Sequence, residues 1–326
     1  MHLKKAYSKA ITVQLKYELQ RYDINKNSIQ TLFIGGGTPS TLEPKLYEKF
    51  LEILSPYLKK DIEFTTEANP NSATYDWLRQ MKNLGVNRVS FGVQSFHDQK
   101  LKYLGRNHSN KDAVNAVENA YKADIQNISL DLIYDTLCDT KDLLKRDLDI
   151  AFSLPINHIS SYSLTIEKAT KFHHDNISPK DDESLAYWFV EKIKERFPQY
   201  EISNFGLYKS KHNIGYWKLK NYIGIGSGAV GFLENKRFYP TTNVKNYIKN
   251  PLSQKTESLS KKDIKTEKIF LGLRSFIGVK KDILSLNELE KANILVKEGK
   301  LICDNLQLFN PNYFLADEIA LFLMED

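Results

Sequence analysis

Strand-like apolar runs alternate with amphipathic segments between residues 31 and 165. The runs are TLFIGGG (31–37), DIEFTTEAN (61–69), RVSFGVQ (88–94), NISLDLIY (127–134) and HISSYSLT (158–165). The segments between them carry apolar residues three and four positions apart, which predicts helices. Strand–helix repeats of about 30 residues predict parallel βαβ units, arranged as a doubly wound sheet or a TIM-like barrel.

The two faces of the predicted strands differ, and the difference favours a barrel. Side chains alternate along a strand, so one face is small or polar and the other apolar. The polar positions of the last four runs are Glu63, Thr65 and Glu67; Ser90, Gly92 and Gln94; Ser129 and Asp131; and Ser161, Ser163 and Thr165. A closed barrel fills its interior with branched apolar side chains. A polar interior therefore indicates a wider, partly open barrel that holds a polar ligand.

The pattern changes after residue 170. A helix is predicted around 182–197, and the stretch 199–232 is rich in glycine and aromatic residues. From about residue 262 the order is helix, a hairpin-like strand pair around Asn305 and helix, which predicts a small winged-helix-like domain. We therefore divide the chain into a partial barrel (1–170), its completion (171–260) and a C-terminal accessory domain (261–326).

The charge is nearly balanced and diffuse. Lys and Arg number 46 against 40 Asp and Glu, a net charge of +6. Interleaved charges of both signs are typical of a solvated surface, and we expect no nucleic-acid partner. No stretch approaches the roughly 20 apolar residues of a membrane span, and the N-terminus lacks the apolar block of a signal peptide. The sequence therefore predicts a cytoplasmic protein without an integral membrane segment.

Cysteine usage excludes several kinds of metal site. The only cysteines are Cys138 and Cys303, far apart in the sequence. Two thiols cannot form a disulfide scaffold, a four-cysteine zinc site or a four-cysteine iron–sulfur site. We therefore assign no metal ligands to this chain.

Polar residues stand where the predicted strands end, which is where α/β barrels place their chemistry. Gly35, Gly36 and Gly37 end the first run and let a ligand approach the backbone closely, since they lack a Cβ. Pro39 favours an extended Thr38. The ends of the next four runs carry Glu67, Gln94, Asp131 and Ser163. Together these residues predict a cup for a polar molecule, zwitterionic or ribose-bearing.

Two further side chains need an explanation. Asp131 interrupts the apolar run ISLDLIY, and an unpaired buried carboxylate is costly. Its partner is either Arg106 or the hydroxyl or ammonium groups of a ligand. His212 lies in HNIGYW beside two aromatic residues that could flank a planar ring, and it is either a haem or metal ligand or an ordinary packing histidine.

Several motifs together, in this order, resemble one superfamily. They are GGGTPS (35–40), TEANP (66–70), GVNRVSFGVQSF (85–96), LKYLGRNH (101–108), LDLIY (130–134), HISSYSLTIE (158–167), YEISNF (200–205), HNIGYW (212–217), YIGIGSGAVG (222–231) and LGLRSFIGV (271–279). The chain resembles the radical S-adenosylmethionine proteins of the oxygen-independent coproporphyrinogen III oxidase superfamily. The HNIGYW motif is similar to the haem-associated motif of its haem-chaperone branch, HemW.

The resemblance implies a partial (β/α)6 barrel and a haem chaperone that binds S-adenosylmethionine and haem. It implies that Gly36, Gly37 and Thr38 contact the methionyl end of S-adenosylmethionine. The residues implied for its other groups are Glu67, Gln94, Arg106 and Asp131, with Ser163 and Ala229 nearby. His212 would be the haem-side residue. The implied partner is a haem-accepting protein, and assembly as a homodimer stays open.

The chain departs from the superfamily at its N-terminus. Members open with an apolar strand and a C-x3-C-x2-C loop whose thiolates hold a [4Fe–4S] cluster, whereas here no cysteine precedes Cys138. We therefore expect a barrel without its first strand and a chain inactive in radical cleavage, through truncation or evolved loss. A second departure is DTLC (135–138), where the superfamily commonly has a Gly-Leu-Pro-Gly turn.

Two other functions stay open. One is an oxygen-independent coproporphyrinogen III oxidase, which performs an oxidative decarboxylation in porphyrin biosynthesis. The other is a cluster-free haem-binding module. The HNIGYW motif argues against the oxidase.

Overall fold

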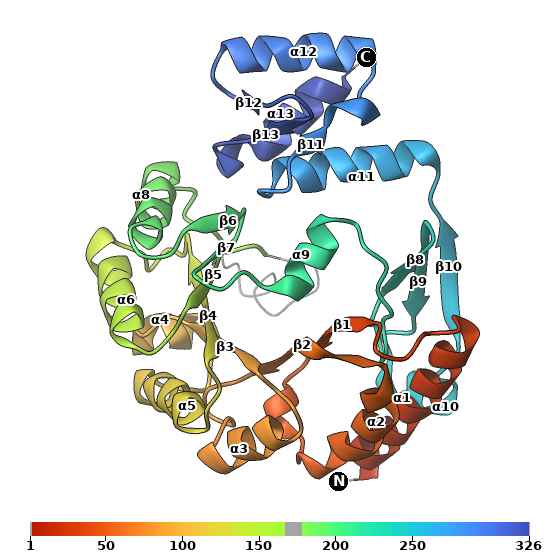
Figure 1. Cartoon of the computed structure of the whole chain (residues 1–326). Coiled ribbons are helices and arrows are strands. Elements are labelled where there is room, and N and C mark those ends of the chain that lie inside the picture. Colours follow the sequence, from red (N-terminus) through yellow and green to blue (C-terminus); the bar gives the residue numbers. More distant parts are fainter. Residues whose placement is uncertain (1, 167–177, 326) are drawn as a thin grey trace. The chain divides into compact units, whose positions relative to one another are not determined.

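The computed structural model describes residues 2–166 and 178–325, and the chain divides into two compact units (Figure 1). The first, here called the barrel unit, comprises Gln30–Lys45 and Asp61–Lys209. The second, here called the accessory unit, comprises Met1–Ile29, Leu46–Lys60 and Ser210–Asp326. Each unit is described by itself.

A seven-stranded sheet forms the barrel unit, with the strand order β1-β2-β3-β4-β5-β7-β6. Its strands are β1 (Ile29–Ile34), β2 (Leu58–Ala68), β3 (Arg88–Gln94), β4 (Asn127–Tyr134), β5 (His158–Ser163), β6 (Gln199–Glu201) and β7 (Asn204–Gly206). Strands β2 to β5 pair in parallel, and β7 pairs antiparallel with both β5 and β6. The curled, mostly parallel sheet confirms the predicted partial barrel (Figure 1).

Helices follow the strands and cover the outer face of this sheet (Figure 1). They are α3 (Tyr75–Asn83), α4 (Asp98–Tyr103), α5 (Asn110–Lys122), α6 (Lys141–Ser153) and α8 (Glu183–Lys194). All except α4 begin at a residue whose side chain accepts a backbone N–H of the first turn, as Ser109 does for α5. The helix-facing side of the sheet is the core: Val89, Phe91, Leu130 and Leu132 are at most 1% exposed.

The accessory unit contains the N-terminal helix of the chain. Its elements up to residue 258 are α1 (His2–Arg21), α2 (Lys45–Leu54), α9 (Lys211–Trp217), α10 (Val244–Lys249) and a three-stranded antiparallel sheet of β8 (Gly231–Leu233), β9 (Lys236–Pro240) and β10 (Gln254–Ser258). The buried Gln14 of α1 holds a glycine-rich loop: its amide donates to the Gly224 carbonyl and accepts from the Gly226 N–H and the Tyr247 hydroxyl.

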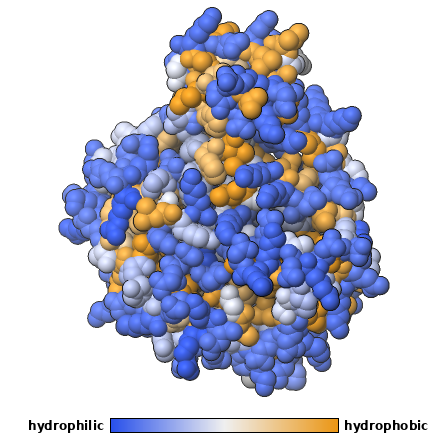
Figure 2. All heavy atoms as spheres, in the orientation of Figure 1, coloured by the Kyte–Doolittle hydropathy of each residue, from blue (hydrophilic) through white to orange (hydrophobic). Residues whose placement is uncertain are grey.

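The last part of the chain has its own apolar cluster, built on Ile269, Leu273, Leu308 and Ile319. Its elements are α11 (Lys261–Leu273), β11 (Val279–Lys280), α12 (Leu286–Lys297), β12 (Ile302–Cys303), β13 (Gln307–Phe309) and α13 (Ala316–Met324). Strands β12 and β13 are antiparallel on either side of Asn305, as the sequence predicts. This order fits a winged-helix-like domain, and apolar residues are visible on its surface in Figure 2.

Two features predicted from the sequence stay predictions. The division at residue 170 falls outside the described residues, and the domain limits at 171–260 and 261–326 are not tested by the two compact units. The loss of a strand before α1 also stays a prediction. Along the described residues, no helix combines the length and the apolar character that a membrane crossing requires.

Candidate functional site

A glycine turn follows β1 in the barrel unit. Gly36 and Gly37 have φ angles of +77° and +68°, a left-handed conformation that L-residues with a side chain rarely adopt. The turn is exposed, and no described atom lies within 4 Å of a Cβ built on either residue. Pro39 then begins a short 3-10 helix (Pro39–Thr41), with Thr38 preceding it at its N-cap. The turn therefore leaves its backbone groups open to a ligand.

Glu67, near the carboxyl end of β2, contacts this turn through its carboxylate. The Gly36 N–H donates to Glu67 Oε2 at 3.0 Å, and a Cβ built on Gly35 would lie 2.8 Å from Glu67 Oε1. Burial raises the pKa of the Glu67 carboxyl, and the Gly36 N–H opposes that rise because it stabilises the anion. Gly35 thus leaves the space in which the Glu67 carboxylate meets the glycine turn.

Gly35→Ala should weaken ligand binding at this turn without unfolding the protein. The added methyl group would lie 2.5 Å from the Phe33 ring and 2.8 Å from Glu67 Oε1, so both side chains must shift. We expect the dissociation constant for S-adenosylmethionine to rise about tenfold, equivalent to about 1.4 kcal/mol. Isothermal titration calorimetry measures it. Gly215→Ala is the matched control, since a Cβ there meets no described atom within 4 Å. Equal affinities in both variants would contradict the expectation.

Asp131 lies on β4, on the same face of the sheet as Glu67. Ser90 pairs in register with Glu67, and its hydroxyl donates to Asp131 Oδ1 at 3.0 Å. Burial raises the pKa of Asp131 to about 6; the Ser90 and Ser160 hydroxyls oppose the rise, and the negative charge of Glu67 adds to it. The sheet therefore holds two carboxylates close enough for the charge of one to affect the other, and both are harder to ionise than in water.

Gln94 and Arg106 join the same end of the sheet. Gln94 ends β3 with a φ of +69° and is buried, and a Cβ built on Gly92 would lie 3.1 Å from its Nε2. The pairing of β3 with β4 shifts register between Phe91 and Gln94, and Gln94 pairs with Leu132, so Gln94 departs from the regular alternation of β3. Arg106 follows α4 and is partly exposed; desolvation of its guanidinium lowers the pKa, and the charge of Asp131 opposes that change. Arg106 and the buried Arg88, whose charge lowers the pKa of Asp131, are thus the cations that act on this carboxylate.

The face predicted for β5 is wrong by one residue. The register pairs Asp131 with Ser160 and Tyr134 with Ser163, and paired residues of neighbouring strands point to one face. Ser160 and Tyr162 therefore accompany Asp131, whereas the exposed Ser163 donates to Asp135 Oδ2 at 2.9 Å. The sequence contains serine at 160, 161 and 163, so it fits either phase of the alternation.

The other two predicted residues, Ala229 and His212, belong to the accessory unit. Ala229 lies in the loop that Gln14 holds, where a Cβ on Gly224 would clash with the Ala229 carbonyl. His212 lies on α9, and its Nε2 is 2.8 Å from the hydroxyl of Tyr216. The Tyr216 ring packs edge-on against Tyr222, with centroids 4.7 Å apart.

Two residues of these groupings, Ser160 and Tyr222, were not predicted from the sequence. Ser160 needed the strand register, which a single sequence does not specify. The contact of Tyr216 with His212 had a signal in the sequence, because positions i and i+4 of a helix share one face and the two residues have this spacing.

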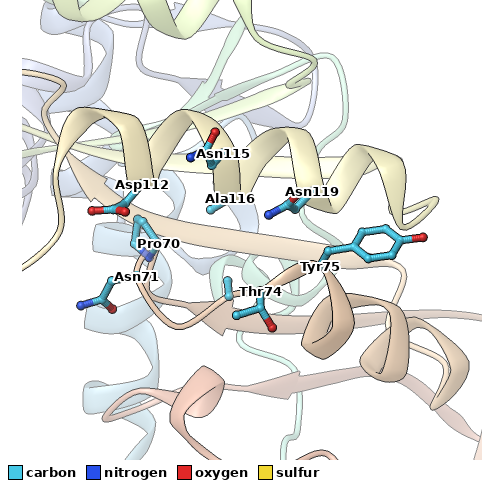
Figure 3. A pocket seen from close by; sticks show the side chains of 9 residues that line it. Pro70, Asn71, Thr74, Tyr75, Asp112, Asn115, Ala116 and Asn119 are labelled. Carbon is cyan, nitrogen blue, oxygen red and sulfur yellow. The ribbon is translucent and has the colours of Figure 1, made fainter.

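A separate hollow of about 200 Å³ lies between the start of α3 and the side of α5 (Figure 3). Short amide side chains dominate its polar lining, among them Asn71, Asn115 and Asn119. It shares no residue with the polar end of the sheet described above. We therefore assign it no part in the candidate site.

Comparisons with known proteins agree with this architecture. Residues 4–146 match the model of the radical SAM superfamily. The structure of coproporphyrinogen III oxidase from Escherichia coli, described as a radical SAM enzyme, superposes with a TM-score of 0.82 over 99% of this chain and 84% of that chain, at 14% identity. The partial barrel, the glycine turn after β1 and the match to the superfamily model together define a protein of the radical SAM class.

Sequence relatives identify the branch. The heme chaperone HemW of Lactococcus lactis is 36% identical over 277 residues, which covers 80% of this chain and 73% of the relative. The heme chaperone HemW of Bacillus subtilis is 36% identical over 272 residues, covering 78% and 72%. The chain therefore belongs to the HemW family, as its motifs predict.

Radical SAM proteins are associated with S-adenosylmethionine and a [4Fe–4S] cluster, and this chain's residues fit the two differently. Cys138 lies in the barrel unit and Cys303 in the accessory unit, and neither stands in a C-x3-C-x2-C motif. Within the described residues, no group of three or more His, Cys, Asp or Glu side chains could hold a metal ion. The residues present thus do not fit the cluster, whereas the exposed glycine turn, two carboxylates and a guanidinium fit the polar groups of S-adenosylmethionine.

Proposed function

We propose that this chain is a haem chaperone that binds haem and S-adenosylmethionine and passes haem to an acceptor protein. Membership of the HemW family carries the proposal, because the relatives are named heme chaperones. The acceptor, a cytoplasmic location and assembly as a homodimer belong to the proposal too. No radical step is part of it.

For S-adenosylmethionine, the support is the match between its charges and the end of the sheet. The ligand carries an ammonium group, a sulfonium, a carboxylate and a ribose diol. Glu67 and Asp131 offer acceptors to the cationic and hydroxyl groups, and Arg106 offers a donor fork to the carboxylate. The open backbone of Gly36 and Gly37 suits the methionyl end. The proposed set is completed by Thr38 and Gln94.

For haem, the support is the exposed aromatic group on α9. His212 is the haem-side residue, and the Tyr216 ring offers a planar apolar surface with 40% of its residue area exposed. A planar porphyrin needs such surfaces on one side and an axial donor at its iron.

Haem titration tests this function. Haem added to the wild-type protein should give a saturable Soret shift, and His212→Ala should alter the spectrum and weaken binding about tenfold or more. His2→Ala, which removes an exposed histidine of the same unit, should change neither. A wild-type protein that leaves the Soret band of free haem unchanged would rule out the proposal.

A further inference from the structure

The hydrogen bond between His212 and Tyr216 brings two potential iron ligands together. The residues lie one turn apart on α9, with 2.8 Å between His212 Nε2 and Tyr216 Oη. Their rings meet edge-on, with centroids 4.8 Å apart and planes at 82°. Both imidazole and phenolate serve as axial haem ligands in proteins. Because these two atoms share a hydrogen bond, an iron that binds one of them must also change the hydrogen bonding of the other.

Tyr216 is the more exposed member of the pair. It is 40% exposed, whereas His212 is half-buried and makes further contacts. The Tyr216 ring also packs against Tyr222, with the ring planes at 84°. Tyr222 is in turn fixed by two backbone hydrogen bonds with Phe232, at 2.8 and 2.9 Å. The phenol is therefore held in place by its neighbours while one side of it faces solvent.

Ligation by tyrosine requires the loss of the hydroxyl proton. His212 Nε2 is at the right distance to accept that proton. A positioned base of this kind lowers the cost of forming a phenolate, as it does for other weakly acidic nucleophiles.

We propose that Tyr216 Oη is the atom that binds the iron of ferric haem, and that His212 Nε2 takes its proton. This inference rests on the proposed haem-binding function. The O–H bond of Tyr216 breaks, an Fe–O bond forms, the proton makes an N–H bond on the imidazole, and the water previously bound to iron leaves. His212 is then the positioning residue of the site.

A dependence on oxidation state follows from this ligand. Phenolate is a hard, anionic donor, and it stabilises the more highly charged ferric iron over ferrous iron. The site should therefore hold ferric haem more tightly than ferrous haem. An imidazole ligand would not impose the same preference, so the two assignments can be told apart.

Four proteins provide the test: the wild type, Tyr216→Phe, His212→Ala and Tyr239→Phe. Tyr239 is the matched control, because it lies in the same unit, is 37% exposed and donates its hydroxyl to Glu257 Oε2 at 2.6 Å. Each protein is titrated with ferric haem and with haem reduced by dithionite. Resonance Raman spectra of the ferric complexes report phenolate vibrations, and circular dichroism confirms folding.

We expect phenolate bands in the wild type, in Tyr239→Phe and, with weaker haem binding, in His212→Ala. Tyr216→Phe should lose these bands and bind ferric haem about tenfold or more weakly, with little change for ferrous haem. A Tyr216→Phe protein with the wild-type spectrum, or a wild type without phenolate bands, would overturn the ligand assignment while leaving haem binding intact. A wild type that binds no haem in either state would instead remove the proposed function, and this inference with it.

Discussion

Replacing Lys100 with methionine should lower the free energy of unfolding by about 3–5 kcal/mol. Lys100 lies on α4 with its side chain fully buried, and its Nζ is 2.6 Å from Asp139 Oδ1 and 2.6 Å from the Ile133 carbonyl. Asp147 Oδ2 is 3.9 Å away. Removing the cation leaves two buried carboxylates facing each other without a positive charge, and the desolvation of those charges is then uncompensated.

Urea denaturation measures this loss, and a surface pair calibrates it. Lys145 and Asp149 form an exposed i,i+4 pair in the same unit, with 2.7 Å between Nζ and Oδ2, so Lys145→Met should cost only about 0.5 kcal/mol or less. Adding Asp139→Asn to Lys100→Met should recover part of the stability, because one unpaired charge is removed. Similar decreases in the free energy of unfolding for Lys100→Met and Lys145→Met would show that the buried ion pair stabilises the fold no more than the exposed pair does.

The same ion pair explains a part of the sequence that departs from the superfamily. Asp135 stands at the head of DTLC and has a φ of +66°, the left-handed conformation for which a glycine is the usual residue. Asp139 then accepts the Thr136 N–H at 2.8 Å and pairs with Lys100. Aspartate tolerates this conformation better than most residues. The loop therefore keeps the backbone conformation of a glycine turn, and the ion pair between Asp139 and Lys100 holds it in place.

Periodicity predicted the barrel well because the parallel strands β2, β3 and β4 are apolar on one side and are each followed by helices. The run NISLDLIY (127–134) coincides with β4, and RVSFGVQ (88–94) with β3. The strand ends also placed Glu67, Gln94 and Asp131 at one end of the sheet. In a parallel sheet, residues at the carboxyl ends of successive strands must meet.

Register and side-chain pairing could not be predicted in the same way. Three serines in HISSYS fit both phases of β5, so Ser163 was chosen where Ser160 faces Asp131. Lys100 looked like one of many surface lysines, and its burial depends on Asp139 and Asp147, which come from later elements of the chain. A single sequence specifies which residues alternate, but contacts between distant segments appear only after folding.

Asp131 should make S-adenosylmethionine binding depend on pH. Burial raises its pKa to about 6, so the carboxylate that would accept the ligand's cationic or hydroxyl groups becomes protonated below that pH. Affinity should be constant above pH 7 and fall up to about tenfold for each unit below pH 6. Asp131→Asn should bind about 30- to 100-fold more weakly at pH 7.5, and its affinity should vary much less with pH.

The stability of the ligand-free protein should change in the opposite direction. A carboxyl whose pKa is higher in the folded than in the unfolded chain binds its proton more tightly when folded. Its contribution is complete below the unfolded pKa of about 4, and it is lost as pH rises through about 6. The wild type should therefore lose about 1–3 kcal/mol between these values relative to Asp131→Asn. Asp149→Asn, at an exposed carboxylate of the same unit, serves as the control.

Calorimetric titrations at several pH values measure the change in ligand affinity, and urea denaturation at the same pH values measures the change in stability. A ligand affinity that stays constant down to pH 5 in the wild type would exclude Asp131 from the binding site.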